Sequence, residues 1–146
     1  MLLDDITGEI IAASLRLHRD LGPGLLESVY EKILARVLTK RGLMIERQKS
    51  ICFEYDGIRF DDGFKVDLLV GGQVVVELKS LEKLAPVHGK QLLTYLRLMN
   101  LPVGLLINFG APTLKEGLHR IVNNLDSSAS PRLRVNRMEE SEGNNP

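Results

Sequence analysis

The sequence predicts a mixed α/β (α+β) domain in which helices pack on a central sheet. Two stretches with helical periodicity open the chain, and short apolar runs separated by turn signals follow them. One more helical stretch stands between two of the later apolar runs. This strand–helix–strand order makes the two flanking strands parallel, so we expect one crossover helix in an otherwise antiparallel sheet.

Composition places the chain among ordinary globular proteins. At 146 residues, with 44% apolar and 26% charged residues, it is long enough for one domain with a sizeable core. The formal net charge is zero, which gives no support to a strongly electrostatic nucleic-acid binder but leaves room for a local basic groove.

Three features predict a cytoplasmic protein with no membrane partner. Cys52 is the single cysteine, which excludes an internal disulfide and fits a reducing compartment. The start, Met1–Asp5, is acidic and lacks the layout of a signal peptide. Every apolar run is shorter than the ~18 residues of a membrane span.

Two helices are expected first. Over Ile6–Leu21 apolar residues recur at helical spacing, and Gly22 followed by Pro23 supplies the exit. A second apolar stripe predicts a helix over Glu27–Arg41, with Gly42 just past its end.

A β region follows. The alternating stretch Met44–Tyr55 precedes Asp56-Gly57, a strong two-residue hairpin signal. The returning strand begins over Ile58–Phe60, and Asp61–Gly63 is predicted to interrupt it before the next hairpin, Phe64–Ser80.

The last elements are a helix, two strands and a tail. Pro86 suits the first turn of a helix that runs to about Asn100. Val103–Phe109 is a short apolar run typical of a buried strand, and we favour a final strand over Leu118–Val122. We expect the domain to occupy residues 1–125 and residues 126–146 to form a disordered tail, because serine, asparagine and charge dominate there.

The hairpin Phe64–Ser80 carries charges in strands that otherwise look buried. Asp67 lies on the first strand, and Glu77 and Lys79 lie on the second, with Gly71-Gly72 between them. Charged side chains are almost never fully buried unless they are paired or bind a metal.

The length of the turn decides whether these charges meet. A two-residue turn pairs Val70 with Gln73 and places Asp67 and Glu77 on opposite faces. A three-residue turn, or a bulge at the glycines, pairs the two acids directly. Facing like charges destabilise a hairpin unless a cation lies between them. We predict the longer turn.

Converging carboxylates form a site for a hard cation. Mg²⁺ takes one or two protein carboxylates, keeps several waters and completes its shell with phosphate oxygens. Such a metal polarises a phosphodiester, and a neighbouring lysine can orient the attacking water or offset charge on the phosphorane. The alternative is a buried salt-bridge cluster, although one lysine cannot neutralise two or three acids.

Four motifs resemble a known family. The pattern Asp67…Glu77-x-Lys79 resembles the PD-(D/E)xK nuclease superfamily, with Val66 in place of the motif's proline. The stretch Gly24–Tyr30 is similar to the GxxExxY motif that names a bacterial family within it. Gln91–Tyr95 resembles the QxxxY motif of RecB-type exonuclease domains, and Leu106–Gly110 fits the same family. The resemblance spans residues 4 to 125 and implies a restriction-endonuclease-like core.

The resemblance also implies a metal site. Asp67 and Glu77 would bind Mg²⁺ or Mn²⁺, together with the backbone carbonyl of Leu78. Glu27, from the N-terminal helix, would be the acid that completes the shell.

The remaining site residues follow from the same resemblance. Lys79 would position the water or stabilise the transition state, Gln91 would orient Lys79 or the scissile phosphate, and Tyr95 would line the site. The implied function is hydrolysis of DNA phosphodiesters, with the QxxxY helix favouring exonuclease-like or single-strand substrates. The alternatives are a catalytically silent nucleic-acid or protein-binding module, or a hydrolase of RNA or another phosphate substrate. Nucleases of this fold often pair, so a homodimer is plausible.

Overall fold

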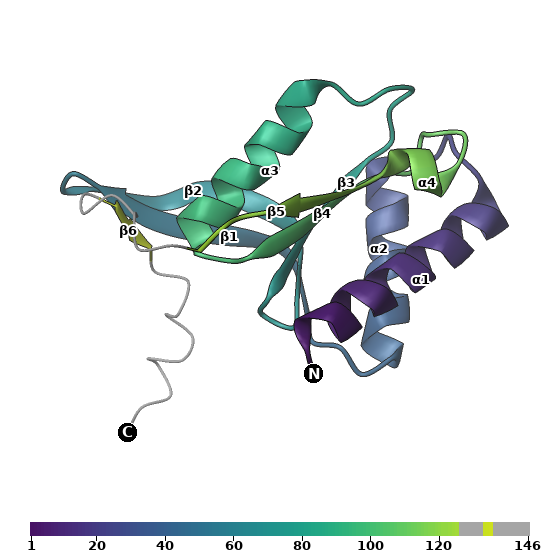
Figure 1. The fold of residues 1–146 in the computed structure, drawn as a ribbon, viewed down its shortest axis with the longest axis horizontal. Helices are drawn as coiled ribbons and strands as arrows, with labels where there is room; N and C mark the ends of the chain where they lie inside the picture. Colours follow the sequence, from purple (N-terminus) through teal and green to yellow (C-terminus); the bar gives the residue numbers. More distant parts are fainter. Residues whose placement is uncertain (126–132, 136–146) are drawn as a thin grey trace.

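One mixed sheet with helices on both faces forms the domain (Figure 1). The computed structural model describes residues 1–125 and 133–135. In that part of the chain the elements are α1 (Leu3–Leu21), α2 (Glu27–Lys40), β1 (Ile45–Tyr55), β2 (Ile58–Val70), β3 (Val74–Lys79), α3 (Pro86–Met99), β4 (Val103–Asn108), α4 (Leu114–Gly117), β5 (Leu118–Val122) and β6 (Leu133–Val135).

The strand order confirms the predicted fold class. The sheet runs β5-β4-β3-β2-β1-β6, and every neighbouring pair is antiparallel except β3 and β4. Those two strands are parallel because α3 carries the chain back across the sheet between them. The two-residue turn predicted at Asp56-Gly57 is also present, since Tyr55 pairs with Ile58.

Two separate cores cover the two faces of the sheet. Figure 1 shows α1 and α2 below the sheet and α3 above it. The first core packs Val74, Val76 and Leu78 of β3 against α1 and α2. The second core packs Val75, the alternate residue of the same strand, against α3. The strand is therefore buried on both faces, which explains why its sequence is an almost continuous apolar run.

The predicted interruption at Asp61–Gly63 is present as an irregularity in the ladder and not as a break in the strand. Strand β2 continues through these residues, but the pairing passes from Ile51–Phe64 to Phe53–Phe60, so β2 has two extra residues between these pairs. The glycine also serves packing here, because a Cβ at Gly63 would lie 2.4 Å from Cε1 of Phe53.

The C-terminal elements differ from expectation in one respect. The predicted strand Leu118–Val122 is present as β5, preceded by the short helix α4. Within the segment predicted to be a tail, Leu133–Val135 instead pairs with β1 as β6. The rest of that segment, residues 126–132 and 136–146, lies outside the described residues. Among the helices of the described residues, none combines the length and apolar character needed to cross a membrane.

Candidate functional site

The turn between β2 and β3 has three residues, as the register argument predicted. Val70 pairs with Val74, so Gly71, Gly72 and Gln73 form the turn. Gly71 and Gly72 have φ of +60° and +66°, a left-handed conformation that glycine adopts without strain. The same register places Asp67 opposite Glu77.

The regular ladder ends before the two acids meet, and their side chains take over its hydrogen bonds. The last ladder pair is Leu68 with Val76. Beyond it, the backbone N–H of Asp67 donates to Oε1 of Glu77 at 3.1 Å. The backbone N–H of Leu78 donates to Oδ2 of Asp67 at 2.8 Å. The two carboxylates are thus held side by side between the strands.

Burial makes this pair of acids electrostatically costly. Glu77 is only 8% exposed. Burial first, and then the Asp67 carboxylate, raise the pKa of Glu77 from 4.5 to about 8, while the charge of Lys79 acts in the opposite direction. A bound cation would offset the repulsion between the two acids, so the donor set fits a divalent metal.

Helix α3 brings Tyr95 to the acids. Its ring stacks on Phe64 with centroids 4.3 Å apart and planes 11° from parallel. Burial, followed by the charges of Glu77 and Asp67, raises the pKa of the Tyr95 hydroxyl. The tyrosine therefore lies near enough to both acids for their charges to act on its hydroxyl.

Gln91 and Lys79 are not joined. Gln91 is exposed on α3, and no hydrogen bond connects it to Lys79 within the described part of the chain. Lys79 is half-buried at the end of β3, in register with Asn108 of β4. The charge of Lys79 acts on Glu77, but among the described residues no contact would let Gln91 orient Lys79.

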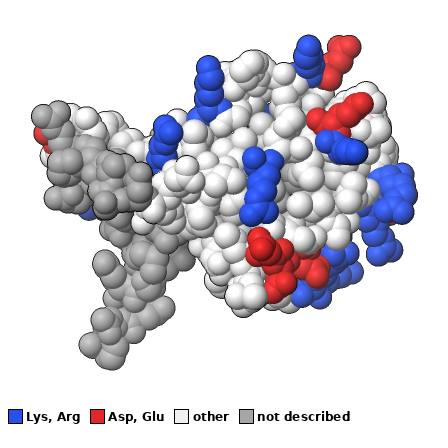
Figure 2. Space-filling model, viewed as in Figure 1, with Lys and Arg blue, Asp and Glu red and all other residues white. Residues whose placement is uncertain are grey.

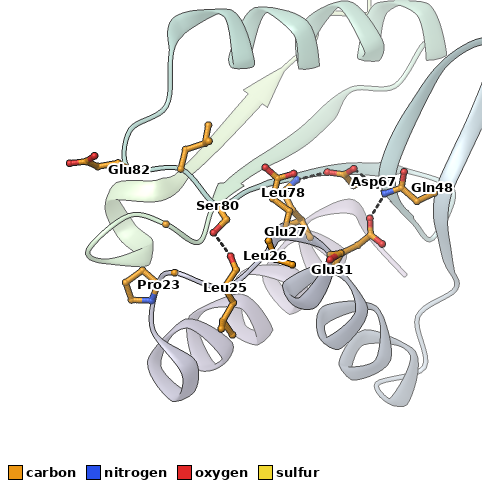
Figure 3. Close-up of a pocket in the computed structure, with 14 residues that line it drawn as sticks. Pro23, Leu25, Leu26, Glu27, Glu31, Gln48, Asp67, Leu78, Ser80 and Glu82 are labelled. Atoms are coloured by element: carbon orange, nitrogen blue, oxygen red, sulfur yellow. Dashed lines mark hydrogen bonds between the residues drawn. The ribbon is translucent and has the colours of Figure 1, made fainter.

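A cavity of about 940 Å³ opens beside Asp67, and Glu27 lies on its wall together with Asp67 and Leu78, whereas Glu77 does not line it (Figure 3). Glu27 is exposed in the first turn of α2. Among the described residues, no three His, Cys, Asp or Glu side chains come close enough to hold one metal ion. The acids therefore stand as an adjacent pair, and Glu27 lines the same cavity as Asp67.

The loop that precedes Glu27 is fixed by Tyr30. The Tyr30 hydroxyl donates to the carbonyl of Gly22 at 2.6 Å and accepts from the N–H of Leu25 at 3.2 Å. Its ring stacks on Phe109 with centroids 4.5 Å apart. Gly24 has φ of +107°, which only glycine adopts without strain. Gly24 and Tyr30, the glycine and the tyrosine of the GxxExxY stretch, therefore fix the conformation of the loop before α2.

The loop before α2 is also hydrogen-bonded to Ser80, which follows β3, and Asn108 at the end of β4 is hydrogen-bonded to the next residue, Leu81. The hydroxyl of Ser80 donates to the carbonyl of Leu25 at 2.5 Å. The Asn108 side chain, 2% exposed, accepts from the N–H of Leu81 and donates to its carbonyl, both at 2.9 Å. It also accepts from the N–H of Gly110 at 3.1 Å. The segment that follows Lys79 is thereby hydrogen-bonded both to the loop before α2 and to β4.

Two residues that the sequence analysis missed also reach the site. Glu31 is buried at 5% exposure on α2, and Gln48 on β1 donates hydrogen bonds both to it and to Asp67. Glu31 could have been found, because it lies four residues after Glu27 and so extends the same side of the helix. Gln48 carries no such signal in a strand that is rich in polar residues.

Comparison with known proteins supplies the family. The family model described as PD-(D/E)XK nuclease superfamily matches residues 4–121. No curated protein and no solved structure matches the chain. Members of this superfamily are generally nucleases that use divalent metals. With the acids of the motif brought together at one end of the hairpin, and with a match that covers most of its length, the chain belongs to the PD-(D/E)XK nuclease superfamily.

Proposed function

We propose that this domain is a metal-dependent nuclease that hydrolyses DNA phosphodiester bonds. The carrying observation is the pairing of Glu77 with Asp67, which lines an open cavity, with Lys79 two residues further along the strand. A buried carboxylate beside a second one is unfavourable in its charged form without a cation. A hard divalent ion with oxygen ligands is the simplest partner for them.

Asp67, Glu77 and the backbone carbonyl of Leu78 would hold Mg²⁺ or Mn²⁺. The ion, when bound, polarises the phosphodiester and makes hydroxide available near neutral pH. Glu27, which lines the same cavity, would complete the shell through a bound water, since Mg²⁺ keeps several waters.

The remaining side chains act on water and phosphate. Lys79 positions the attacking water or offsets the charge that develops on the phosphorane. Tyr95 closes the site on the α3 side, where its ring is fixed by Phe64. Gln91, exposed on the same helix, is free to contact the scissile phosphate.

We further infer that the chain is a GxxExxY member of the superfamily acting in the cytoplasm. The contacts of Gly24 and Tyr30 around Glu27 support the first inference.

The charge of the protein says little about the class of substrate. Net charge is zero, and on the face shown in Figure 2 basic side chains lie among acidic ones. We therefore expect a few local phosphate contacts rather than strong general affinity for nucleic acid. Single-stranded or end-bearing DNA is the favoured substrate, and the domain acts as a monomer or homodimer.

A catalytically silent binding module is the second candidate. The observations that favour it are the absence of a three-acid group among the described residues and the lack of contact between Gln91 and Lys79. Such a module would bind nucleic acid equally well with and without metal. An RNA or other phosphate hydrolase differs from the main proposal only in substrate and is resolved by the same assay.

The test is cleavage of a panel of double-stranded, single-stranded and branched DNA and of RNA, with Mg²⁺ or Mn²⁺. Lys79→Ala and Glu77→Ala should each lower the rate by about a thousandfold, in the range of losses for groups that stabilise a transition state. Lys83→Ala, an exposed lysine four residues later, is the control and should cleave normally. Cleavage that survives both site variants would contradict the proposal, and metal-independent binding without cleavage would favour the silent module.

A further inference from the structure

Gln48 has a backbone conformation that a strand residue rarely adopts. It lies inside β1 with φ of +48°, in the left-handed region. Its neighbours Arg47 and Lys49 pair normally with Leu68 and Val66, but the ladder skips the pair that Gln48 would form with Asp67. Strain of this kind persists only where the surroundings enforce it, and it clusters at functional sites.

The side chain of Gln48 bridges two carboxylates. Its Nε2 donates to Oδ1 of Asp67 at 3.2 Å and also to Oε1 of Glu31 (Figure 3). Ionised carboxylates only accept hydrogen bonds, so the NH₂ group must face them. Both amide hydrogens of Gln48 are therefore committed to these two acids.

Glu31 is itself held in place. It is buried on α2, and its other oxygen, Oε2, accepts from Arg47 at 2.9 Å (Nη2) and 3.3 Å (Nε). Glu31 thus presents a fixed acceptor to Gln48 on one side while Arg47 balances its charge on the other. Figure 3 shows the chain of hydrogen bonds that results, from Glu31 through Gln48 and Asp67 to Leu78.

We propose that Gln48 is a positioning residue for Asp67. The Asp67 carboxylate receives one donor on each oxygen, Gln48 on Oδ1 and the Leu78 N–H on Oδ2. Its plane is therefore fixed before any ion arrives, and each oxygen keeps a lone pair for coordination. Hydrogen-bond partners behind a metal ligand raise metal affinity by about 10- to 100-fold in other proteins. The proposal rests on the proposed function, because it assumes that Asp67 binds a metal.

The first test is calorimetric titration of the full chain with MgCl₂ and with MnCl₂. Gln48→Met removes both donors at similar side-chain length, and we expect cation affinity to fall about tenfold. Gln48→Gly also removes the donors but relieves the backbone strain, because glycine tolerates positive φ. We expect it to keep or gain thermal stability while losing the same affinity. A residue that matters only for folding would not separate the two measurements. Gln73→Met, the same change in the β2–β3 turn, is the control and should bind as the wild type does.

The second test needs no metal. The amide proton of Leu78 reports on Asp67, to which it donates. Its NMR resonance should shift in Gln48→Met and Gln48→Gly and stay unchanged in Gln73→Met.

The outcomes separate this proposal from the proposed function. Cation affinities of the two Gln48 variants within twofold of the wild type would overturn the positioning role even if the domain cleaves DNA. A wild-type domain that binds the cation but cleaves no substrate would overturn the nuclease proposal and leave the role of Gln48 to the titration. A wild-type domain that binds neither cation overturns both.

Discussion

The two halves of β3 are built on different principles. From Val74 to Val76 the strand pairs with β2 through a regular ladder, and its side chains are fully buried. From Glu77 onward the neighbours on the β2 side are reached through side chains instead, as Asp67 and Glu77 each accept a backbone N–H. The pairing with β4 continues unbroken through both halves. The pairing of β3 with β4 therefore stays regular along the whole strand, whereas the pairing of β3 with β2 ends before the two acids, which lie just beyond its end.

The two halves of the strand affect the stability of the domain in opposite ways. The ladder half gains from apolar burial and main-chain hydrogen bonds. In the acid half, burial of Glu77 beside the Asp67 carboxylate disfavours the charged form of Glu77 and so lowers the stability of the folded state at high pH. Substitutions in the two halves should therefore change stability in opposite directions.

The largest effect is expected at Glu77 and depends on pH. Because the native pKa is about 8 and the ordinary value is 4.5, the folded state holds this proton more tightly than the unfolded state. The contribution is present in full below pH 4.5 and is lost as pH rises through 8. In the absence of metal, the free energy of unfolding should fall by up to about 5 kcal/mol across this range from Glu77 alone.

Urea unfolding of the wild type and of Glu77→Gln, from pH 5 to pH 9 with a chelator, measures this effect. The variant should lack most of the decline and be the more stable protein at pH 9. Replacing the chelator by MgCl₂ should restore stability to the wild type alone, since a ligand of the native state stabilises it. If the unfolding free energies of the two proteins change in parallel with pH, Glu77 is not the group that makes stability depend on pH.

Asn108 should cause the next largest loss, because it holds the acid half without carrying charge. Asn108→Ala leaves the partly buried N–H and C=O of Leu81 and the N–H of Gly110 without their partner. Unsatisfied buried groups of this kind cost about 1–3 kcal/mol each, and we expect a total loss of about 3–4 kcal/mol in unfolding free energy. Asn124→Ala, at an exposed position, is the control and should stay within about 0.5 kcal/mol of the wild type.

Several of these relations could be predicted from the sequence, and others could not. The pairing of Asp67 with Glu77 follows from the two-residue period of a strand and the length of one turn, both of which are local. The role of Gln48 depends on a left-handed backbone inside β1 and on partners from α2 and β2. No local pattern encodes that arrangement. The packing role of Gly63 could not be predicted, because the ring it accommodates comes from a neighbouring strand.

Substitution in the ladder half sharpens the contrast. Val76 lies next to Glu77 but is fully buried in the core under α1 and α2. Val76→Ala should lower the free energy of unfolding by about 2–3 kcal/mol at every pH, because it removes packed methyl groups and leaves a cavity. Calorimetric unfolding checks the value, with Val122→Ala, 58% exposed, as the control. A pH-dependent loss at Val76 would show that the two halves of the strand are coupled rather than distinct.

The smallest expected effect is at Tyr30, which fixes the loop before α2. Tyr30→Phe keeps the stack on Phe109 and removes only the hydroxyl that joins Gly22 to Leu25. We expect a loss of about 1 kcal/mol in unfolding free energy, the usual value for a hydrogen bond. If the loop holds Glu27 at the cavity, cation affinity should also weaken, whereas Tyr55→Phe at an exposed position should change neither quantity. Unchanged affinity with reduced stability would mean that Glu27 contributes nothing to the metal site, and that Asp67 and Glu77 hold the ion without it.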